Sequence, residues 1–491
     1  MRRIPAIGLL AALLAGCGTT VPLAQQTVTA GSGLGDSVTA PATAAPLGGT
    51  AVDPSSSVLN GGGGTGGTLV SGTTGAVVAG GTGSGSTGGS SGTVRDTKPV
   101  TVAVFYLNGG NAVISSAFPG SSVSFGDGKK EATTVINDAN AHGGAGGHKM
   151  VPYFVPVEVQ DANDAGLQKA CQGAVQDSHP VAIFAMFNLA EGLATCAKKA
   201  HVVIIDVALG AGDDHLYAAA PDIAFSPSQM SRDSEQKLVL GLAHQAGRLP
   251  AGKTVGVLVQ NDDPLYARVA KSTIEPLLKG WGVPFIEQSI STGADTNGIN
   301  AAIIKFASSN VDTVVFSLGN GGIPEVLFMQ SAEQQQYRPA YLMGDSTNTN
   351  FVGGSAPANQ IKRISGAGTY PLANVRADQY PSSPGERRCL ALLDKAIGGY
   401  NDRNSSLTGT LYCEIVQSFA FVAGRVTGSL TPASWAQAYH GIGSGYPAVT
   451  TFSTRFLPGL MTGASSFRSL GYGTACACIT YTSAIRTVPS L

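Results

Sequence analysis

The stretch that most constrains the fold runs from Lys253 to Phe285. It begins with an apolar run, Thr254–Val259, which is typical of a strand buried on both faces of a parallel sheet. Asp263 and Pro264 then suit the cap and the first turn of a helix. The helix continues with apolar residues at helical spacing: Leu265, Val269, Ile274 and Leu277. A second strand follows, so the stretch predicts a βαβ unit whose polar loop lies where open α/β sheets bind ligands.

The same alternation of strands and helices fills the chain from about residue 97 onward. Expected strands are Val100–Tyr106, Met150–Glu158, Pro180–Phe187, Val202–Val207, Val311–Leu318, Ala340–Met343 and Ile364–Tyr370. Expected helices are Lys129–Ala141, Ala162–Gln176, Glu191–Ala200, Ser226–Arg248, Asn300–Ser308, Ile323–Gln334, Arg388–Ala396, Tyr412–Gly424 and Thr431–Tyr439, with a short hairpin after Tyr446. Short loops between these segments predict an α/β protein with two doubly wound parallel-sheet lobes that face each other.

The segment before this alternation has a different composition. It holds 15 glycines between Gly61 and Thr93, and no charged residue lies between Asp53 and Arg95. Such a segment buries too little apolar surface to offset its ordering entropy, so we expect a disordered tether. The net charge of the whole chain is −1, which does not favour a nucleic-acid partner.

The first residues predict export. Arg2 and Arg3 precede the apolar stretch Ile4–Leu14, which is too short to span a bilayer and is typical of a signal peptide. The following Leu14-Ala-Gly-Cys17 resembles the lipobox of bacterial lipoproteins, which implies a lipid on Cys17 and cleavage before it. We therefore expect a signal peptide at residues 1–16 and a lipid-anchored flexible linker at 17–98. The alternative is an ordinary signal peptide in which Cys17 has no special role.

The other six cysteines are an even number in an exported chain, which favours disulfides. Cys171 and Cys196 lie on expected helices at either end of one strand, so they are predicted to pair. This bond would close a loop of about 25 residues and stabilise the fold by about 3 kcal/mol. The remaining cysteines permit three pairings, and the sequence does not choose among them: Cys389, Cys413, Cys476 and Cys478. Half of a metal site at Cys476-Ala-Cys478 is the alternative, but no histidine lies near it.

Motifs of catalysis are missing from the sequence. The glycine loop Leu107–Asn111 has neither the Lys-Ser/Thr ending of a P-loop nor the spacing of a dinucleotide fingerprint. No Gly-x-Ser-x-Gly elbow lies in a strand–turn–helix context, and the seven histidines are scattered. We therefore expect no enzyme, no cofactor and no metal site.

Several stretches carry a family resemblance: VTVAVFYLNGG, FSPSQMSRDSEQKLVLGLAHQAGRLPAGKTVGVLVQNDDPLYA, VDTVVFSLGNGGIPEVLFMQSAE, YLMGD and TLYCEIVQSFAFVAGRV. Their order resembles the type I periplasmic-binding fold, in the branch of the branched-chain amino-acid binding proteins of ABC transporters. The resemblance implies two lobes joined by a three-stranded hinge. Lobe 1 would comprise residues 99–225 and 369–450, and lobe 2 would comprise 226–368 and 451–491. The lipobox and tether are similar to those of lipoproteins with an actinobacterial type of envelope.

The resemblance also implies which residues meet the ligand. Tyr266 stands at the aromatic position of the family's Asp-x-x-Tyr-Gly loop, although Ala267 replaces the glycine. The other implied positions are Asn320, Asp345, Ser346 and Tyr412. The carboxyl ends of the first-lobe strands add Asn108, Phe187 and Asn188 as expected ligand contacts.

One departure bears on the ligand. Amino-acid binders of this family usually hold the ligand carboxylate with Ser or Thr hydroxyls after the third and fourth strands. This chain has Phe187–Leu189 and Ala208–Gly210 at those places. A carboxylate would lose hydrogen bonds worth about 1.5–3 kcal/mol each, which favours a less charged or partly apolar solute.

The sequence thus predicts a monomeric solute receptor outside the cytoplasm, held at the cell membrane by its lipid anchor. Its expected partners are a small-molecule solute and the permease and ATPase of an ABC importer. The alternative is a ligand-sensing module of the same fold that takes no part in transport, and the fold alone does not separate the two.

Overall fold

The computed structural model describes residues 98–112, 124–186, 189–207 and 210–489, without the side chains of Gln160 and Asn320. Cys17, the signal peptide, most of the predicted linker, Phe187 and Asn188 lie outside the described residues. Within the described ranges, no helix is both long enough and apolar enough to cross a membrane.

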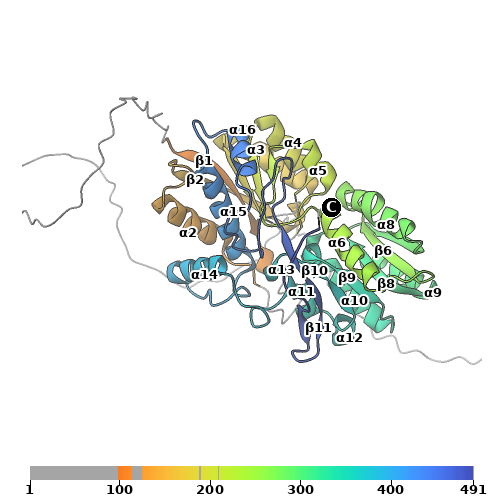
Figure 1. The fold of residues 1–491 in the computed structure, drawn as a ribbon. Helices are drawn as coiled ribbons and strands as arrows, with labels where there is room; N and C mark the ends of the chain where they lie inside the picture. The colour runs from red at the N-terminus through yellow and green to blue at the C-terminus, as the bar shows by residue number, and fades with distance from the viewer. Residues whose placement is uncertain (1–97, 113–123, 187–188, 208–209, 490–491) are drawn as a thin grey trace, which may run out of the picture. The chain divides into compact units, whose positions relative to one another are not determined.

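The first sheet has five parallel strands in the order β2-β1-β3-β4-β5. Its strands β1 and β2 are labelled in Figure 1. Its strands are β1 (Val100–Asn108), β2 (Met150–Glu158), β3 (Ala182–Ala185), β4 (Val203–Asp206) and β5 (Ala224–Phe225). Every residue of β3 and β4 is buried, because helices cover both faces of the sheet.

The second sheet has the order β12-β11-β10-β9-β8-β6-β7, with β13 paired to β11. Its parallel strands are β6 (Thr254–Gln260), β7 (Phe285–Ile290), β8 (Val311–Ser317), β9 (Ala340–Met343) and β10 (Ile364–Gly368). Its antiparallel strands are β11 (Ser466–Gly473), β12 (Cys478–Tyr481) and β13 (Arg486–Thr487). The predicted terminal hairpin is therefore confirmed as β11 and β12, which extend this sheet.

Helices connect and cover the strands. Those that pack with the first sheet or beside it are α2 (Gly128–Ala141), α3 (Asp164–Ser178), α4 (Glu191–Ala200), α5 (Asp214–Ala219), α14 (Pro384–Ala396), α15 (Leu407–Ala423) and α16 (Pro432–His440). Those that accompany the second sheet are α6 (Arg232–Gln245), α7 (Pro264–Val269), α8 (Glu275–Gly280), α9 (Thr296–Ser308), α10 (Ile323–Gln334), α11 (Thr349–Ser355) and α12 (Ala358–Ile361). Short turns add η1 (Val159–Asp161), η3 (Asn320–Gly322), η4 (Asp345–Thr347) and α13 (Pro371–Asn374).

The predicted βαβ unit is present as β6, a long helix and β7. Asp263 caps the helix by accepting a hydrogen bond from the Leu265 amide, and Pro264 occupies its first turn, as predicted. The helix contains a π-helical turn, η2 (Ala270–Ile274), between α7 and α8. Pro276 has no amide hydrogen to donate to the preceding turn, which gives a physical reason for the irregularity.

The π turn changes which residues face the core. Leu265, Val269 and Ile274 are buried as expected, and the last two are five positions apart. After the π turn Leu278 is fully buried, whereas Leu277 is half-buried and packs against the margin of the core. A regular helical period does not anticipate the extra residue in the turn.

The helix expected at Ser226–Arg248 is shorter at both ends. α6 starts at Arg232 because the Ser231 side chain accepts a hydrogen bond from the Ser234 amide and caps the helix there. Before the cap, Ser226 forms a bridge with Thr462, and Pro227 and Ser228 lie in a turn.

Three segments connect the two lobes: one after β5, one after β10 and one before β11. They are hydrogen-bonded to one another through Ser226 and Met461, Ser226 and Gly463, and Phe452 and Thr369. This arrangement is the expected three-stranded hinge.

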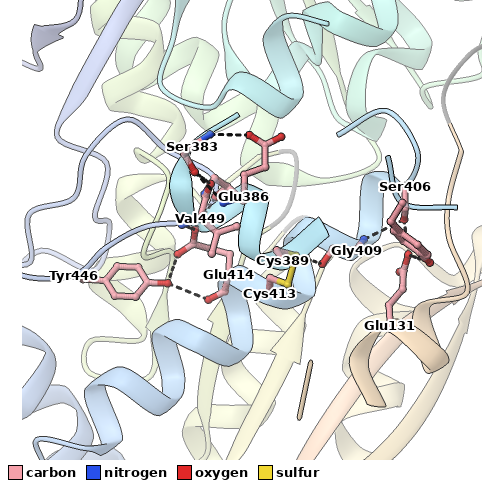
Figure 2. Close-up of a disulfide and its surroundings, with 12 residues drawn as sticks. Glu131, Ser383, Glu386, Cys389, Ser406, Gly409, Cys413, Glu414, Tyr446 and Val449 are labelled. Carbon is pink, nitrogen blue, oxygen red and sulfur yellow. Dashed lines mark hydrogen bonds between the residues drawn. A yellow bond between two sulfur atoms is a disulfide. The ribbon is translucent and has the colours of Figure 1, made fainter. Parts of the chain in front are cut away.

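Three disulfides are present among the described cysteines. The predicted bond between Cys171 and Cys196 joins α3 and α4 with a Cα–Cα distance of 6.3 Å. Cys389 and Cys413 join α14 and α15 with a Cα–Cα distance of 6.0 Å (Figure 2). Cys476 pairs with Cys478. The structure thus selects one of the three pairings that the sequence left open.

Candidate functional site

The loops that follow the strands of the two sheets meet at Arg232, in the first turn of α6. The Arg232 side chain is buried and donates from Nε to the Ala211 carbonyl, beyond β4, at 3.1 Å. It also donates from Nη1 to the Leu318 carbonyl, beyond β8, at 3.0 Å. One guanidinium therefore joins the carboxyl ends of the first and second sheets, because its fork of donors reaches both carbonyls.

Tyr266 lies beside this guanidinium on α7. The Arg232 carbon Cζ is 5.0 Å from the centre of the Tyr266 ring, which is a cation–π distance. The Tyr266 hydroxyl lies against Gly319, where a Cβ would come within 2.1 Å of it. Only glycine therefore permits this approach of the ring to the end of β8.

Tyr266 also lines a small cavity between the two lobes. The cavity has a volume of about 30 Å³, and its walls are Ala162, Asn163, Asp164, Leu167, Ala190, Gln260, Asp262, Asp263 and Tyr266. That volume suffices for about one water molecule. A larger solute needs the lobes to move apart, which the three-stranded hinge permits.

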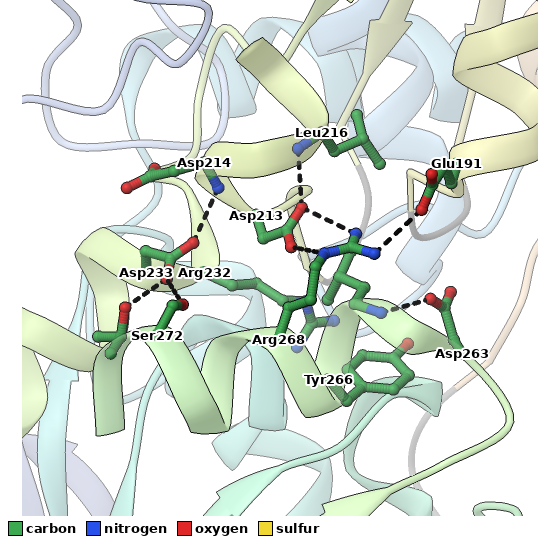
Figure 3. Close-up of polar contacts among 12 residues, drawn as sticks. Glu191, Asp213, Asp214, Leu216, Arg232, Asp233, Asp263, Tyr266, Arg268 and Ser272 are labelled. Carbon is green, nitrogen blue, oxygen red and sulfur yellow. Dashed lines mark hydrogen bonds and ion pairs between the residues drawn. The ribbon is translucent and has the colours of Figure 1, made fainter. Parts of the chain in front are cut away.

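A second guanidinium, that of Arg268, forms ion pairs across the same boundary (Figure 3). Its Nε lies 2.7 Å from Asp213 Oδ2 and its Nη1 lies 3.0 Å from Glu191 Oε2. The Asp213 side chain is 2% exposed and also caps α5 through the Leu216 amide. Because α7 belongs to the second sheet's side and both acids to the first, these ion pairs hold the two lobes together.

The cavity wall carries an excess of negative charge. Asp164 accepts a hydrogen bond from the Gly192 amide, and Asp262 accepts one from the Gln260 side chain. Burial raises the pKa of Asp263 above its ordinary value, and the nearby charge of Asp164 adds to the rise. A solute carboxylate at this wall would meet like charges, whereas a hydrogen-bond donor or a cation would meet acceptors.

One turn along α6 from Arg232, Glu235 holds the loop after β9. Ser346 donates to the Glu235 carboxylate from its hydroxyl, at 2.5 Å, and from its amide. Burial raises the pKa of Glu235 to about 7, and the charge of Asp345 contributes to the rise. Gly344 makes room for this contact, since a Cβ there would lie 2.3 Å from a Glu235 oxygen.

The Asp345 side chain is hydrogen-bonded to the hinge. Its carboxylate accepts hydrogen bonds from the Thr369 amide, the Tyr370 amide and the Asn374 side chain, at 2.6–3.2 Å. The Thr369 hydroxyl also donates to it. These contacts hold the segment that leaves β10 toward the first lobe, so the carboxylate points into the hinge and not into the cavity.

The other predicted ligand contacts are spread over the lobes. Asn108 is exposed at the end of β1, and its side chain donates to Glu158 at 2.7 Å. Tyr412 is buried in the first lobe and donates to the Phe105 carbonyl at 3.2 Å. Asn320 starts η3 at the end of β8. Of the described site residues with described side chains, only Tyr266 lines the cavity.

The residues that join the lobes were not anticipated from the sequence. Arg232 and Arg268 have partners up to 86 positions away along the chain. Position in the sequence was the only available signal. Arg232 lies in the first turn of a helix, and Arg268 lies two positions after Tyr266 in the helix that follows β6. Among the described residues, no group of three or more His, Cys, Asp or Glu side chains is placed to hold a metal ion.

Comparisons with known proteins place this fold. No family model and no curated protein matches the sequence. Among solved structures, a branched chain amino acid ABC transporter protein from Thermus thermophilus with bound valine superposes with a TM-score of 0.60 and 17% identity. The match covers 80% of this chain and 97% of that one.

Two further structures show the same likeness. LivJ from Streptococcus pneumoniae, in complex with isoleucine, has a TM-score of 0.56 and 17% identity over 79% of this chain and 99% of that one. A solute binding protein of an ABC transporter from Rhodopseudomonas palustris, in complex with p-hydroxybenzoic acid, has a TM-score of 0.58 and 14% identity over 79% and 97%. The chain therefore has the type I periplasmic-binding fold.

Proposed function

We propose that this protein captures a small solute between its two lobes and delivers it to an ABC importer. The observation that carries the proposal is the meeting of strand-end loops from both sheets around Tyr266, Arg232 and Arg268. A ligand bound there contacts both lobes, and only contacts unique to the closed arrangement shift the balance between open and closed states. The similar solved structures bind their solutes as components of ABC transporters.

The proposed site has Tyr266 at its centre, with Asn108, Phe187, Asn188 and Asn320 from the neighbouring strand ends. Tyr266 offers a flat apolar face and a hydroxyl at its tip, which suits a solute with both kinds of surface. Asp345, Ser346 and Tyr412 would act from behind this site by supporting the loops that form it.

The solute class follows from the charges of the cavity wall. The cavity is lined by three carboxylates, those of Asp164, Asp262 and Asp263. Two unit charges 4 Å apart interact by about 4 kcal/mol at an effective dielectric constant of 20. The wall therefore disfavours an anionic solute, and we propose a neutral or cationic solute with an apolar part.

The location follows from the amino-terminal sequence. We propose that residues 1–16 are removed, that Cys17 carries the lipid anchor, and that the receptor faces the outside of the cell membrane. The glycine-rich linker would keep the globular part free to reach its permease.

The solute and the role of Tyr266 are tested together. Native mass spectrometry of protein purified without added ligand should reveal a bound small molecule, and calorimetric titration then measures its affinity. Tyr266→Ala should weaken binding by about 1–3 kcal/mol, because a buried aromatic contact is lost. Tyr153→Ala is the control, since Tyr153 lies on β2 and lines a different groove of the first lobe.

Two outcomes of that titration contradict the proposal. Unchanged affinity in Tyr266→Ala would place the site elsewhere in the molecule. A copurified solute whose binding strengthens when Asp263→Asn removes a negative charge would be an anion, which would contradict the proposed solute class.

A further inference from the structure

The three disulfides in the described part of the chain are of two kinds. Two of them join pairs of helices across separations of 25 and 24 residues, and all four of their cysteines are buried. The third joins Cys476, in the turn between β11 and β12, to Cys478, the first residue of β12 and only two positions further along. There Cys476 is half-buried and Ala477 is exposed.

The Cys476–Cys478 bond closes a ring with one residue between its ends. Loop-closure stabilisation grows with the number of residues enclosed, so this bond constrains the unfolded chain far less than the two long ones do. The hairpin around it is already aligned by four residue pairs, from Leu470 with Tyr481 to Gly473 with Cys478. The fold therefore depends little on this bond.

The ring also holds Ala477 in a costly backbone conformation. Its φ angle is 48°, in the left-handed region that Gly and Asn adopt readily but other residues rarely do. The four-residue turn between the paired Gly473 and Cys478 also constrains Ala477, so reduction of the bond removes one of two constraints and lets part of this strain relax.

The bond is remote from the ligand site. β11 runs antiparallel to β10, and Gly368 at the carboxyl end of β10 pairs with Arg468. Gly473 and Cys478 therefore lie beyond the amino-terminal end of β10. Tyr266 and Arg232 lie at the other end of the parallel strands, where the strands have their carboxyl ends. A change at this bond does not need to disturb solute binding.

We propose that Cys476–Cys478 is an exchange-active disulfide that low-molecular-weight thiols reduce reversibly while the rest of the fold stays intact. A thiolate attacks the half-buried Sγ of Cys476, the Sγ–Sγ bond breaks, and Cys478 leaves as a thiolate that takes up a proton. A second thiolate attacks the resulting mixed disulfide and releases Cys476 as its thiolate, which is protonated in turn. Two electrons thus pass from two thiols, which become one disulfide, to the protein.

The test uses the full-length protein, folded and without denaturant. It is equilibrated with graded ratios of reduced to oxidised glutathione, alkylated and mapped by peptide mass spectrometry, while circular dichroism follows the fold. We expect Cys476 and Cys478 to be alkylated at ratios at least tenfold lower than those that expose the other four cysteines, with unchanged dichroism. Returning the protein to oxidised glutathione should restore the bond.

Two variants make the result specific. Cys476→Ser with Cys478→Ser should show no new thiols in that range and should keep the thermal midpoint of the wild type. Ala477→Gly should need about a fivefold higher ratio, since glycine adopts a positive φ without the cost that alanine bears.

Three results would overturn the proposal. One is a Cys476–Cys478 bond that resists glutathione as long as the two helix-joining bonds. Another is reduction that begins only when the dichroism signal is lost. The third is an Ala477→Gly variant reduced as easily as the wild type, which would contradict the contribution assigned to the backbone of Ala477.

Discussion

Glu325, in the first turn of α10, is a buried carboxyl with no hydrogen-bond partner on another described residue. Its side chain is 0% exposed, and neither of its oxygens is bonded to a neighbouring group. Burial raises the pKa of Glu325 to about 8; the charge of Glu235 adds to the rise and Arg232 opposes it. In the folded protein this carboxyl therefore holds its proton at neutral pH.

The raised pKa predicts a loss of stability as pH rises. An unfolded Glu325 ionises near its ordinary pKa of 4.5, so between that pH and about 8 the unfolded state binds fewer protons than the folded one. The free energy of unfolding then falls by up to about 1.4 kcal/mol per pH unit for this one group. Glu325→Gln removes the charge and keeps the shape, so between pH 5 and 8.5 it should lose less stability than the wild type in urea titrations.

Glu333, on the same helix, is the matched control. Its bonds to Arg338 and Asn359 lower the pKa of Glu333 to about 2, so it is ionised in both states above pH 5. The free energy of unfolding of Glu333→Gln should therefore change with pH in parallel with that of the wild type across this range. A Glu325→Gln curve that also runs parallel would show that Glu325 does not hold its proton in the folded state.

At the scale of elements, α7 connects the lobes through Arg268. The helix starts at Pro264 in the loop after β6, and this start brings Arg268 to Asp213 and Glu191 beside α5 and α4. The Arg268 side chain is 26% exposed, so its ion pairs are only partly screened by water. They stabilise the arrangement in which the lobes touch.

We expect Arg268→Gln to loosen that arrangement. Without solute, the variant should have a larger radius of gyration by X-ray scattering, and it should bind the copurified solute about 1 kcal/mol more weakly, because the closed state has lost its ion pairs. Arg338→Gln is the control, since Arg338 pairs with Glu333 within one lobe. Equal scattering and affinity in both variants would mean that Arg268 has no part in closure.

At the scale of the whole molecule, the proposal for where the protein works rests on the amino-terminal sequence. Cys17→Ala should abolish lipid attachment, because the thiol that would carry the lipid is gone. Cell fractionation should then find the protein released from the membrane or left as an uncleaved precursor. A mature Cys17→Ala protein that stays in the membrane fraction would rule out the anchor proposed for Cys17.

Local patterns in the sequence determined much of the fold. Apolar runs such as Thr254–Val259 indicate buried strands, and Asp263 with Pro264 indicates a helix start, because burial and capping depend on neighbours a few positions away. The order of these segments predicted the two parallel sheets, and the helices around one strand predicted the pairing of Cys171 with Cys196. The pairing of the other four cysteines needed the folded chain.

The tertiary structure alone decided what meets at the lobe boundary. Arg232 bonds to Ala211, and Arg268 to Asp213, only because the hinge brings the carboxyl ends of two separate sheets together. The amides of the hinge also bind the Asp345 carboxylate. In the sequence Asp345 is an acid at the end of a strand, where a ligand contact is equally expected. Periodicity records which face of a segment is buried, but the partner of a charge depends on how distant segments cross in space, and no local pattern encodes that.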